Sequence, residues 1–169
     1  MPLRFGICTV SDRAHRGERP DASGPALAER ITAKGWQVVK QQTVPDDQDE
    51  ISKILKEWAD GPQVDVILTT GGTGFAPRDV TPEATLSVIQ REAPGLSEMM
   101  RAASAAKSPH AMLSRARAGL RGRVLIVNLP GSPRAAVENL EIIAPTLEHA
   151  VQLLHEDPAA ETGHRKGVV

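Results

Sequence analysis

Apolar residues occur in short runs that are separated by polar, glycine-containing stretches. The runs at residues 4–10, 64–70 and 124–129 are rich in β-branched residues, and residues 36–44 read as a further strand. Between the strands, apolar positions recur at helical spacing, as over residues 51–58. Strands that are apolar throughout and alternate with helices predict a mostly parallel sheet covered on both faces. We therefore expect a three-layer α/β/α fold.

Helix boundaries are marked by proline, glycine and hydroxyl residues. Thr81-Pro82-Glu83 predicts a helix start, with a hydroxyl N-cap, proline in the first turn and an acid at the positive end of the dipole. This helix is expected to run to about Glu92 and to be broken by Pro94-Gly95. Residues 11–24 are expected to form a polar loop, and residues 120–123 a turn between two short strands. Further helices are expected over 25–34 (capped at Gly35), around 51–58 and over 96–106. A last helix is expected after residue 133, interrupted by Pro145 and ending near Leu154.

Length and composition predict one domain over residues 1–155 and a polar, flexible tail over residues 156–169, in a chain of 169 residues. The net charge of −1, the 2% of aromatic residues and the lack of tyrosine argue against nucleic-acid binding. No apolar stretch approaches membrane-spanning length, and no signal segment is visible, so we expect a cytoplasmic protein that does not bind membranes. The single cysteine, Cys8, lies in an apolar run and is expected to be a buried structural thiol.

A glycine turn follows the strand at residues 64–70. Gly71-Gly72-Thr73-Gly74 leaves backbone donors free to point outward, and Arg78 and Asp79 follow a few residues later. Backbone donors, a cation and an acid together are suited to a phosphate and its metal ion. Glycine pairs occur in many tight turns, so this motif alone is weak evidence.

Four polar segments directly follow strands, and their convergence is stronger evidence than any one motif. In a parallel sheet, the segments at residues 11–13, 46–47, 71–79 and 128–132 would meet at one edge, where ligands bind in such sheets. Each residue also has a structural reading. Asp46 and Ser132 could cap helices, Asp12 could form an Asx turn, and Arg13 and Arg78 could be solvated charges.

Residues 68–85, LTTGGTGFAPRDVTPEAT, resemble the signature of the molybdopterin adenylyltransferase family, which includes bacterial Mog and MoaB proteins and the gephyrin G domain. The resemblance covers about residues 4 to 154. Further matching segments are residues 9–13, 23–25, 44–47, 92–95, 113–115 and 128–132.

The resemblance implies a MoaB/Mog-like fold and a Mg²⁺-dependent transfer of AMP from ATP to the terminal phosphate of molybdopterin, with release of pyrophosphate. It also implies a homotrimer and a possible hand-off of product to a molybdate-insertion enzyme. The two functional aspartates of the family fall on Asp46 and Asp79, which would hold Mg²⁺. The expected substrate-binding residues are Ser11, Asp12, Arg13, Gly71, Gly72, Thr73, Gly74, Arg78, Ser114, Arg115, Pro130, Gly131 and Ser132, with Arg134 a further candidate.

The chemistry is consistent with the residue types. A phosphate monoester with a second pKa of about 6 is largely dianionic at neutral pH and needs no general base. The five histidines lack paired metal-ligand spacing. The main alternative is a non-catalytic molybdopterin carrier or scaffold. A molybdate-insertion enzyme would need a longer chain, and a general nucleotide-binding protein would usually carry GxxxxGK[ST] or GxGxxG after a strand, which this sequence does not.

Overall fold

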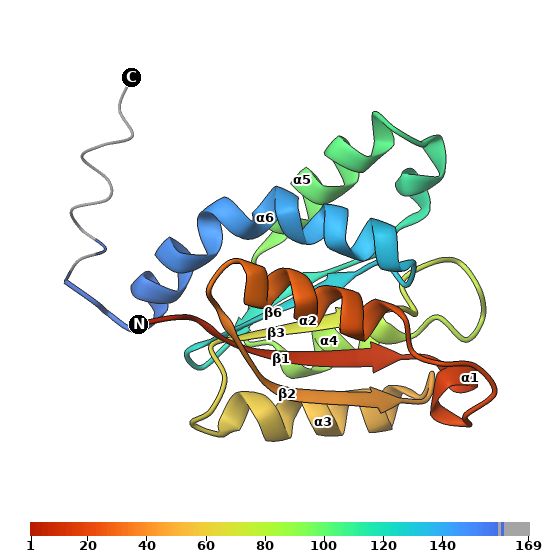
Figure 1. The fold of residues 1–169 in the computed structure, drawn as a ribbon, viewed down its shortest axis with the longest axis horizontal. Coiled ribbons are helices and arrows are strands. Elements are labelled where there is room, and N and C mark those ends of the chain that lie inside the picture. The colour runs from red at the N-terminus through yellow and green to blue at the C-terminus, as the bar shows by residue number, and fades with distance from the viewer. Residues whose placement is uncertain (159, 161–169) are drawn as a thin grey trace.

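The computed structural model describes residues 1–158 and 160, and these form three layers, with a sheet between two layers of helices (Figure 1). Within these residues the sheet has six strands in the order β2-β1-β3-β6-β5-β4. Strands β2, β1, β3 and β6 are parallel, and β5 and β4 continue the sheet in antiparallel pairing. The strands are β1 (Arg4–Val10), β2 (Gln37–Val44), β3 (Val66–Thr70), β4 (Arg91–Glu92), β5 (Ala118–Arg121) and β6 (Val124–Leu129).

Helices cover both faces of the sheet. Figure 1 shows α2, α5 and α6 above the sheet and α3 and α4 below it. The helices are α1 (Asp12–His15), α2 (Ser23–Ala33), α3 (Gln48–Asp60), α4 (Thr81–Val88), α5 (Pro94–Ala105), the 3₁₀ turn η1 (Pro109–Leu113) and α6 (Pro133–Leu154).

Strands β1, β3 and β6 are largely apolar because each contributes side chains to two cores. In β1, Phe5 and Ile7 belong to the core under α2 and α6, whereas Cys8 and Val10 belong to the core over α3 together with Ile51. Burial raises the pKa of the Cys8 thiol to about 12, so the thiol stays protonated and serves packing. The expected three-layer fold and the structural role of Cys8 are confirmed.

The expected helix start at Thr81 was wrong in its detail. Val80 precedes the helix as its N-cap residue, and the Thr81 hydroxyl instead donates to the carbonyl of Gly71 at 2.9 Å. The helix α4 ends at Val88 and does not reach Glu92, because residues 91–92 pair with β5 as a short edge strand.

Other boundaries also differ from expectation. The polar stretch over residues 11–24 contains the short helix α1, and α2 already begins at Ser23. Pro94 begins α5 and does not break a helix, since proline fits the first turn, where no N–H partner is needed. Helix α6 continues through Pro145, whose neighbours Ala144 and Leu147 are buried in the core. Of the expected polar tail, residues 159 and 161–169 lie outside the described part of the chain.

An ion-pair group joins α2 and its C-terminal end to α6. Glu141 accepts hydrogen bonds from the Arg30 guanidinium and from Lys34 Nζ, the latter at 2.9 Å. These cations lower the pKa of Glu141 from 4.5 to about 2, with Arg30 the larger cause. The contribution of this group to stability is therefore fully present above pH 4.5 and is lost as the pH falls toward 2.

Replacing Glu141 with glutamine should lower the free energy of unfolding at pH 7 by about 1 kcal/mol, because the group is partly exposed and solvent screens it. The difference from the parent chain should shrink as the pH is lowered from 4.5 toward 2, which urea titrations at several pH values would measure. Glu29→Gln, on the exposed side of α2, is the matched control and should change little. A constant difference across this pH range would contradict the assignment.

Candidate functional site

A cavity of about 460 Å³ lies at the C-terminal edge of the parallel strands. The ends of these strands are in register, since Val10 pairs with Val44 and Thr70 pairs with Leu129. The segments that follow the strands therefore meet at one edge, as the sequence predicted. The cavity is lined by residues 9–11, 14, 19–23, 46, 70–72, 79 and 131–133.

The glycine turn passes too close to its neighbours for any side chain to fit. Gly71 and Gly72 have φ values of 105° and 67°, which residues with a side chain rarely adopt. A Cβ on Gly71 would lie 2.3 Å from the carbonyl oxygen of Val10, and one on Gly72 would lie 2.4 Å from the Thr81 hydroxyl and 3.2 Å from Asp46 Oδ1. The glycines therefore allow the turn to lie directly against β1 and Asp46.

Asp46 is fixed by a reciprocal pair of hydrogen bonds with Asp12. The Asp12 N–H donates to Asp46 Oδ2 at 2.9 Å, and the Asp46 N–H donates to Asp12 Oδ1 at 3.0 Å. Arg78 donates to both carboxylate oxygens of Asp12, at 2.5 and 3.1 Å, and to the Asp46 carbonyl at 3.2 Å. Arg78, followed by the Asp46 N–H, keeps the pKa of Asp12 below its ordinary value. Asp47, not Asp46, caps α3, so the capping interpretation of Asp46 was wrong.

Asp46 and Asp79 line the same cavity, and their charges interact. Burial is the main cause that raises the pKa of Asp46, and the nearby charges of Asp12 and Asp79 add to it. Two carboxylates that repel each other in a half-buried site are suited to a cation between them.

The free oxygens of these carboxylates fit Mg²⁺. Among the described residues, Asp46 Oδ1 and Asp79 Oδ1 accept no hydrogen bond, whereas Asp79 Oδ2 accepts from the Ala76 N–H at 3.0 Å. The described residues contain no group of three or more His, Cys, Asp or Glu that could hold a metal. Mg²⁺ commonly uses one or two carboxylates and completes its shell with water and substrate phosphates, so these two aspartates would be sufficient.

Arg115 holds the loop that carries Asp79. Its guanidinium donates to the carbonyl oxygens of Gly74 at 2.7 Å and Asp79 at 2.6 Å, and it pairs with the carboxylate of Glu83. The Arg115 N–H also donates to the Thr73 carbonyl at 2.7 Å. The guanidinium of Arg115 is therefore occupied by contacts within the chain. These contacts hold the loop at Thr73 and Gly74 on one side and at Asp79 on the other.

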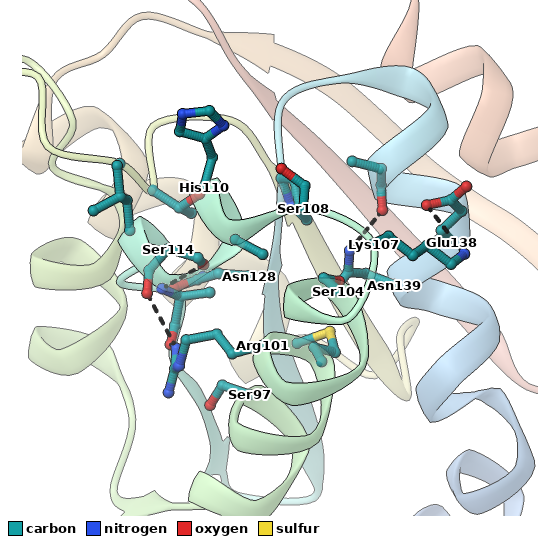
Figure 2. Close-up of a pocket in the computed structure, with 18 residues that line it drawn as sticks. Ser97, Arg101, Ser104, Lys107, Ser108, His110, Ser114, Asn128, Glu138 and Asn139 are labelled. Atoms are coloured by element: carbon teal, nitrogen blue, oxygen red, sulfur yellow. Dashed lines mark hydrogen bonds and ion pairs between the residues drawn. The ribbon is translucent and has the colours of Figure 1, made fainter.

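A second cavity of about 350 Å³ lies on the other side of the glycine turn, between α5, η1 and the start of α6 (Figure 2). Thr73, Gly74 and Pro130 contribute to its wall. Figure 2 shows Arg101 beside the Ser114 carbonyl, to which it donates at 3.4 Å, and Lys107 paired with Glu138 at 3.5 Å. The labelled polar side chains around it are those of Ser97, Ser104, Ser108, His110, Ser114, Asn128 and Asn139.

Nine of the predicted binding residues line one of the two cavities, and Asp12, Arg13, Arg78 and Arg115 line neither. Arg13 is exposed and, like Asp12 and Arg78, is not among the residues that line either cavity, whereas Ser132 caps α6 by accepting from the Ala135 N–H at 3.3 Å. Their roles in binding stay predictions. The first cavity receives Ser11, Gly71, Gly72, Gly131 and Ser132, and the second receives Thr73, Gly74, Ser114 and Pro130.

Several lining residues were missed from the sequence. Arg19 and Asp21 reach the first cavity from the segment between α1 and α2, and Arg101 and Lys107 reach the second from α5 and the turn after it. Asp21 Oδ1 accepts from the Gly24 N–H at 3.0 Å, a capping contact that its position three residues before Gly24 could have indicated. No local sequence signal points to Arg19.

The family model described as "Probable molybdopterin binding domain" matches residues 6–149. The chain is 41% identical over 154 residues to a molybdopterin adenylyltransferase of Helicobacter pylori, covering 90% of this chain and 88% of the relative. It is 44% identical over 157 residues to the molybdenum cofactor synthesis protein cinnamon of Drosophila melanogaster, covering 92% of this chain but only 26% of that longer protein.

A solved structure has the same fold. The molybdopterin biosynthesis enzyme MoaB from Thermus thermophilus superposes with a TM-score of 0.86 and 50% identity, over 92% of this chain and 98% of that one. Because the family model spans most of the chain and the relatives agree with it, the chain belongs to the family of molybdopterin-binding domains.

Proposed function

We propose that the chain transfers the AMP group of ATP to the terminal phosphate of molybdopterin and releases pyrophosphate. The observation that carries this proposal is the placement of Asp46 and Asp79 in one cavity, next to a second cavity across the glycine turn. The Helicobacter pylori relative, which is named for this activity, is covered over 88% of its length. In this proposal the first cavity holds the nucleotide, and the second holds the pterin.

The second cavity suits a small heterocycle with an anionic end. Its volume of about 350 Å³ falls in the range of small-molecule sites, and hydroxyl and amide groups around it can bond ring nitrogens and oxygens. Arg101 adds positive charge beside it, and Lys107, which also lines it, pairs with Glu138. Thr73 and Gly74 separate this cavity from the nucleotide, so a phosphate at its inner end would face the α-phosphorus of ATP.

The chain's own groups position the reactants and need not remove a proton. A phosphate oxygen of molybdopterin attacks the α-phosphorus, the bond from that phosphorus to the bridging oxygen breaks, and pyrophosphate leaves with the electron pair. Because the attacking phosphate is already dianionic, no general base is required. Bound Mg²⁺ would offset the charge of the phosphates. The exposed backbone of the glycine turn can donate hydrogen bonds to the same oxygens.

The decisive experiment measures pyrophosphate release from ATP by the purified chain. We expect release to depend on both Mg²⁺ and molybdopterin, with adenylyl-molybdopterin formed in equal amount. Binding of molybdopterin without any cleavage of ATP would support the carrier or scaffold alternative. Cleavage of ATP that is independent of molybdopterin would contradict both proposals.

We also propose that the chain assembles as a homotrimer, as the family resemblance implies. An apolar groove of about 920 Å³ runs along α5 and the C-terminal half of α6, away from the two cavities. Met99 and Leu153 at this groove are 59% and 50% exposed, so burial against another copy would remove apolar surface from water. Light scattering of the purified chain would test this, and Met99→Glu should favour the monomer.

The proposed function also leads to an expected cellular location and partner enzyme. No helix within the described residues is both long and apolar enough to cross a membrane. We propose a cytoplasmic enzyme that passes adenylyl-molybdopterin to a molybdate-insertion enzyme. Co-purification with such an enzyme, and its dependence on bound product, would test the hand-off.

A further inference from the structure

The first cavity has an excess of negative charge. Among the described residues that line it are three carboxylates, those of Asp21, Asp46 and Asp79, and a single cation, Arg19. A nucleoside triphosphate is itself strongly anionic. Mg²⁺ on Asp46 and Asp79 would offset part of this charge, and Arg19 is the side chain of the lining that can offset more of it.

Two other arginines near the cavity are already engaged, and Arg13, which is exposed, does not line it. Arg78 forms a two-bond ion pair with Asp12, and Arg115 bonds two carbonyls and Glu83. Arg19 is exposed, and within residues 1–158 and 160 it has no ion-pair partner. It is thus the guanidinium at this cavity whose donors are free to bind an anion.

The backbone on either side of Arg19 is anchored, although its side chain is free. Asp21 Oδ2 accepts from the Thr9 hydroxyl at 2.8 Å, and Asp21 Oδ1 accepts from the Gly24 N–H, so the segment is tied to β1 and to the start of α2. On the other side, the Glu18 N–H donates to the Arg13 carbonyl at 2.9 Å. A ligand that binds Arg19 therefore has to order one side chain and not a whole loop.

The segment that carries Arg19 lies across the cavity from the proposed pterin site. In Figure 1 the α1 region lies beyond the ends of β1 and β2, whereas α5 lies above the sheet. The attacking and leaving oxygens of a phosphoryl-type transfer are roughly in line with the phosphorus between them. If molybdopterin approaches from the side of Thr73 and Gly74, pyrophosphate departs toward the α1–α2 segment.

We propose that Arg19 binds the β- and γ-phosphates of ATP and stabilises the departing pyrophosphate. This inference rests on the proposed function, because it needs ATP in the first cavity. It assigns to Arg19 a contact that AMP cannot make, since AMP lacks these two phosphates. Arg19 thereby distinguishes ATP from AMP at this site.

The test compares Arg19→Ala with the parent chain by calorimetric titration with Mg·ATP, Mg·pyrophosphate and AMP. We expect Arg19→Ala to weaken the binding of ATP and of pyrophosphate by about tenfold or more, and that of AMP by less than about twofold. Arg19→Lys keeps the charge but not the paired donors and should fall in between. The matched control is Arg16→Ala, in the same segment, where Arg16 pairs with Glu18 at 2.7 Å outside the cavity lining. It should leave all three affinities unchanged.

The outcomes separate this inference from the function on which it rests. Parent-like binding of ATP and pyrophosphate by Arg19→Ala would overturn the inference and leave the proposed function standing. If Arg19→Ala weakened the binding of AMP as much as that of ATP, the inference would also be overturned, because the contact would then be to the nucleoside or α-phosphate. If Arg16→Ala weakened ATP binding as much as Arg19→Ala does, the effect would come from the whole segment and the inference would again fail. Failure of the parent chain to bind ATP would refute the proposed function itself, whereas binding of ATP without binding of pyrophosphate would overturn only the inference.

Discussion

Replacing Asp79 with alanine is expected to lower the rate of adenylyl transfer by at least about 10²- to 10³-fold. The proposed Mg²⁺ would lose one of its two carboxylate ligands, so the charge that builds on the phosphates would be offset less well. Asp79 keeps a free Oδ1 in the first cavity, while its Oδ2 bonds the Ala76 N–H. Binding of molybdopterin in the second cavity should be largely retained, since Asp79 does not line it. Steady-state pyrophosphate release and a separate pterin-binding titration would measure the two effects.

Asp79→Asn separates charge from loop structure. The amide oxygen can still accept from the Ala76 N–H, so the loop keeps its hydrogen bond while the negative charge is lost. We expect Asn to be nearly as inactive as Ala. The control Asp60→Ala removes a surface carboxylate that pairs with Arg121 at 2.8 Å, far from both cavities, and should leave turnover unchanged. Parent-like turnover in Asp79→Asn would remove this carboxylate from the mechanism.

The second large effect is expected for Gly71→Ala. The added Cβ would lie 2.3 Å from the Val10 carbonyl oxygen, at a φ of 105°, so the turn must move away from β1. Backbone strain and the clash together should lower the free energy of unfolding by about 3 kcal/mol or more. Because the turn lines the first cavity, the KM for ATP should rise as well. Urea denaturation and steady-state kinetics would record both changes.

Gly122→Ala provides the matched control for this substitution. Gly122 has a φ of 54°, yet nothing lies within 4 Å of a Cβ built there. The variant should therefore lose only about 1 kcal/mol from the backbone preference and keep full activity. Equal losses in the free energy of unfolding for the two variants would show that the close approach of Gly71 to β1 adds nothing to the cost of the substitution.

The sequence predicted the sheet well because the strand signal is strong wherever both faces of a strand are buried. Residues 4–10 and 124–129 were predicted with the bounds that the structure has, and each contributes to two cores. The same logic predicted that Asp46 and Asp79 would meet, because both follow parallel strands. Topology alone places them at one edge.

Three of the errors arose where a residue has a partner that its local sequence does not reveal. The Thr81 hydroxyl bonds the Gly71 carbonyl and so does not cap its own helix. Residues 91–92 form an edge strand only because β5 is beside them. Arg19 reaches the first cavity because Asp21 ties the α1–α2 segment to Thr9. None of these contacts follows from periodicity or capping preference.

The strip between the two cavities is a shared wall with almost no room for adjustment. The Gly71 N–H bonds the Leu129 carbonyl at 3.1 Å, the Thr70 hydroxyl bonds the Pro130 carbonyl at 2.7 Å, and a Cβ on Gly131 would lie 3.2 Å from the Gly71 Cα. A wall held by these contacts would fix the spacing between the nucleotide and the pterin of the proposed reaction. Because the two cavities share this wall, a substitution that changes the shape of one cavity would also change the shape of the other.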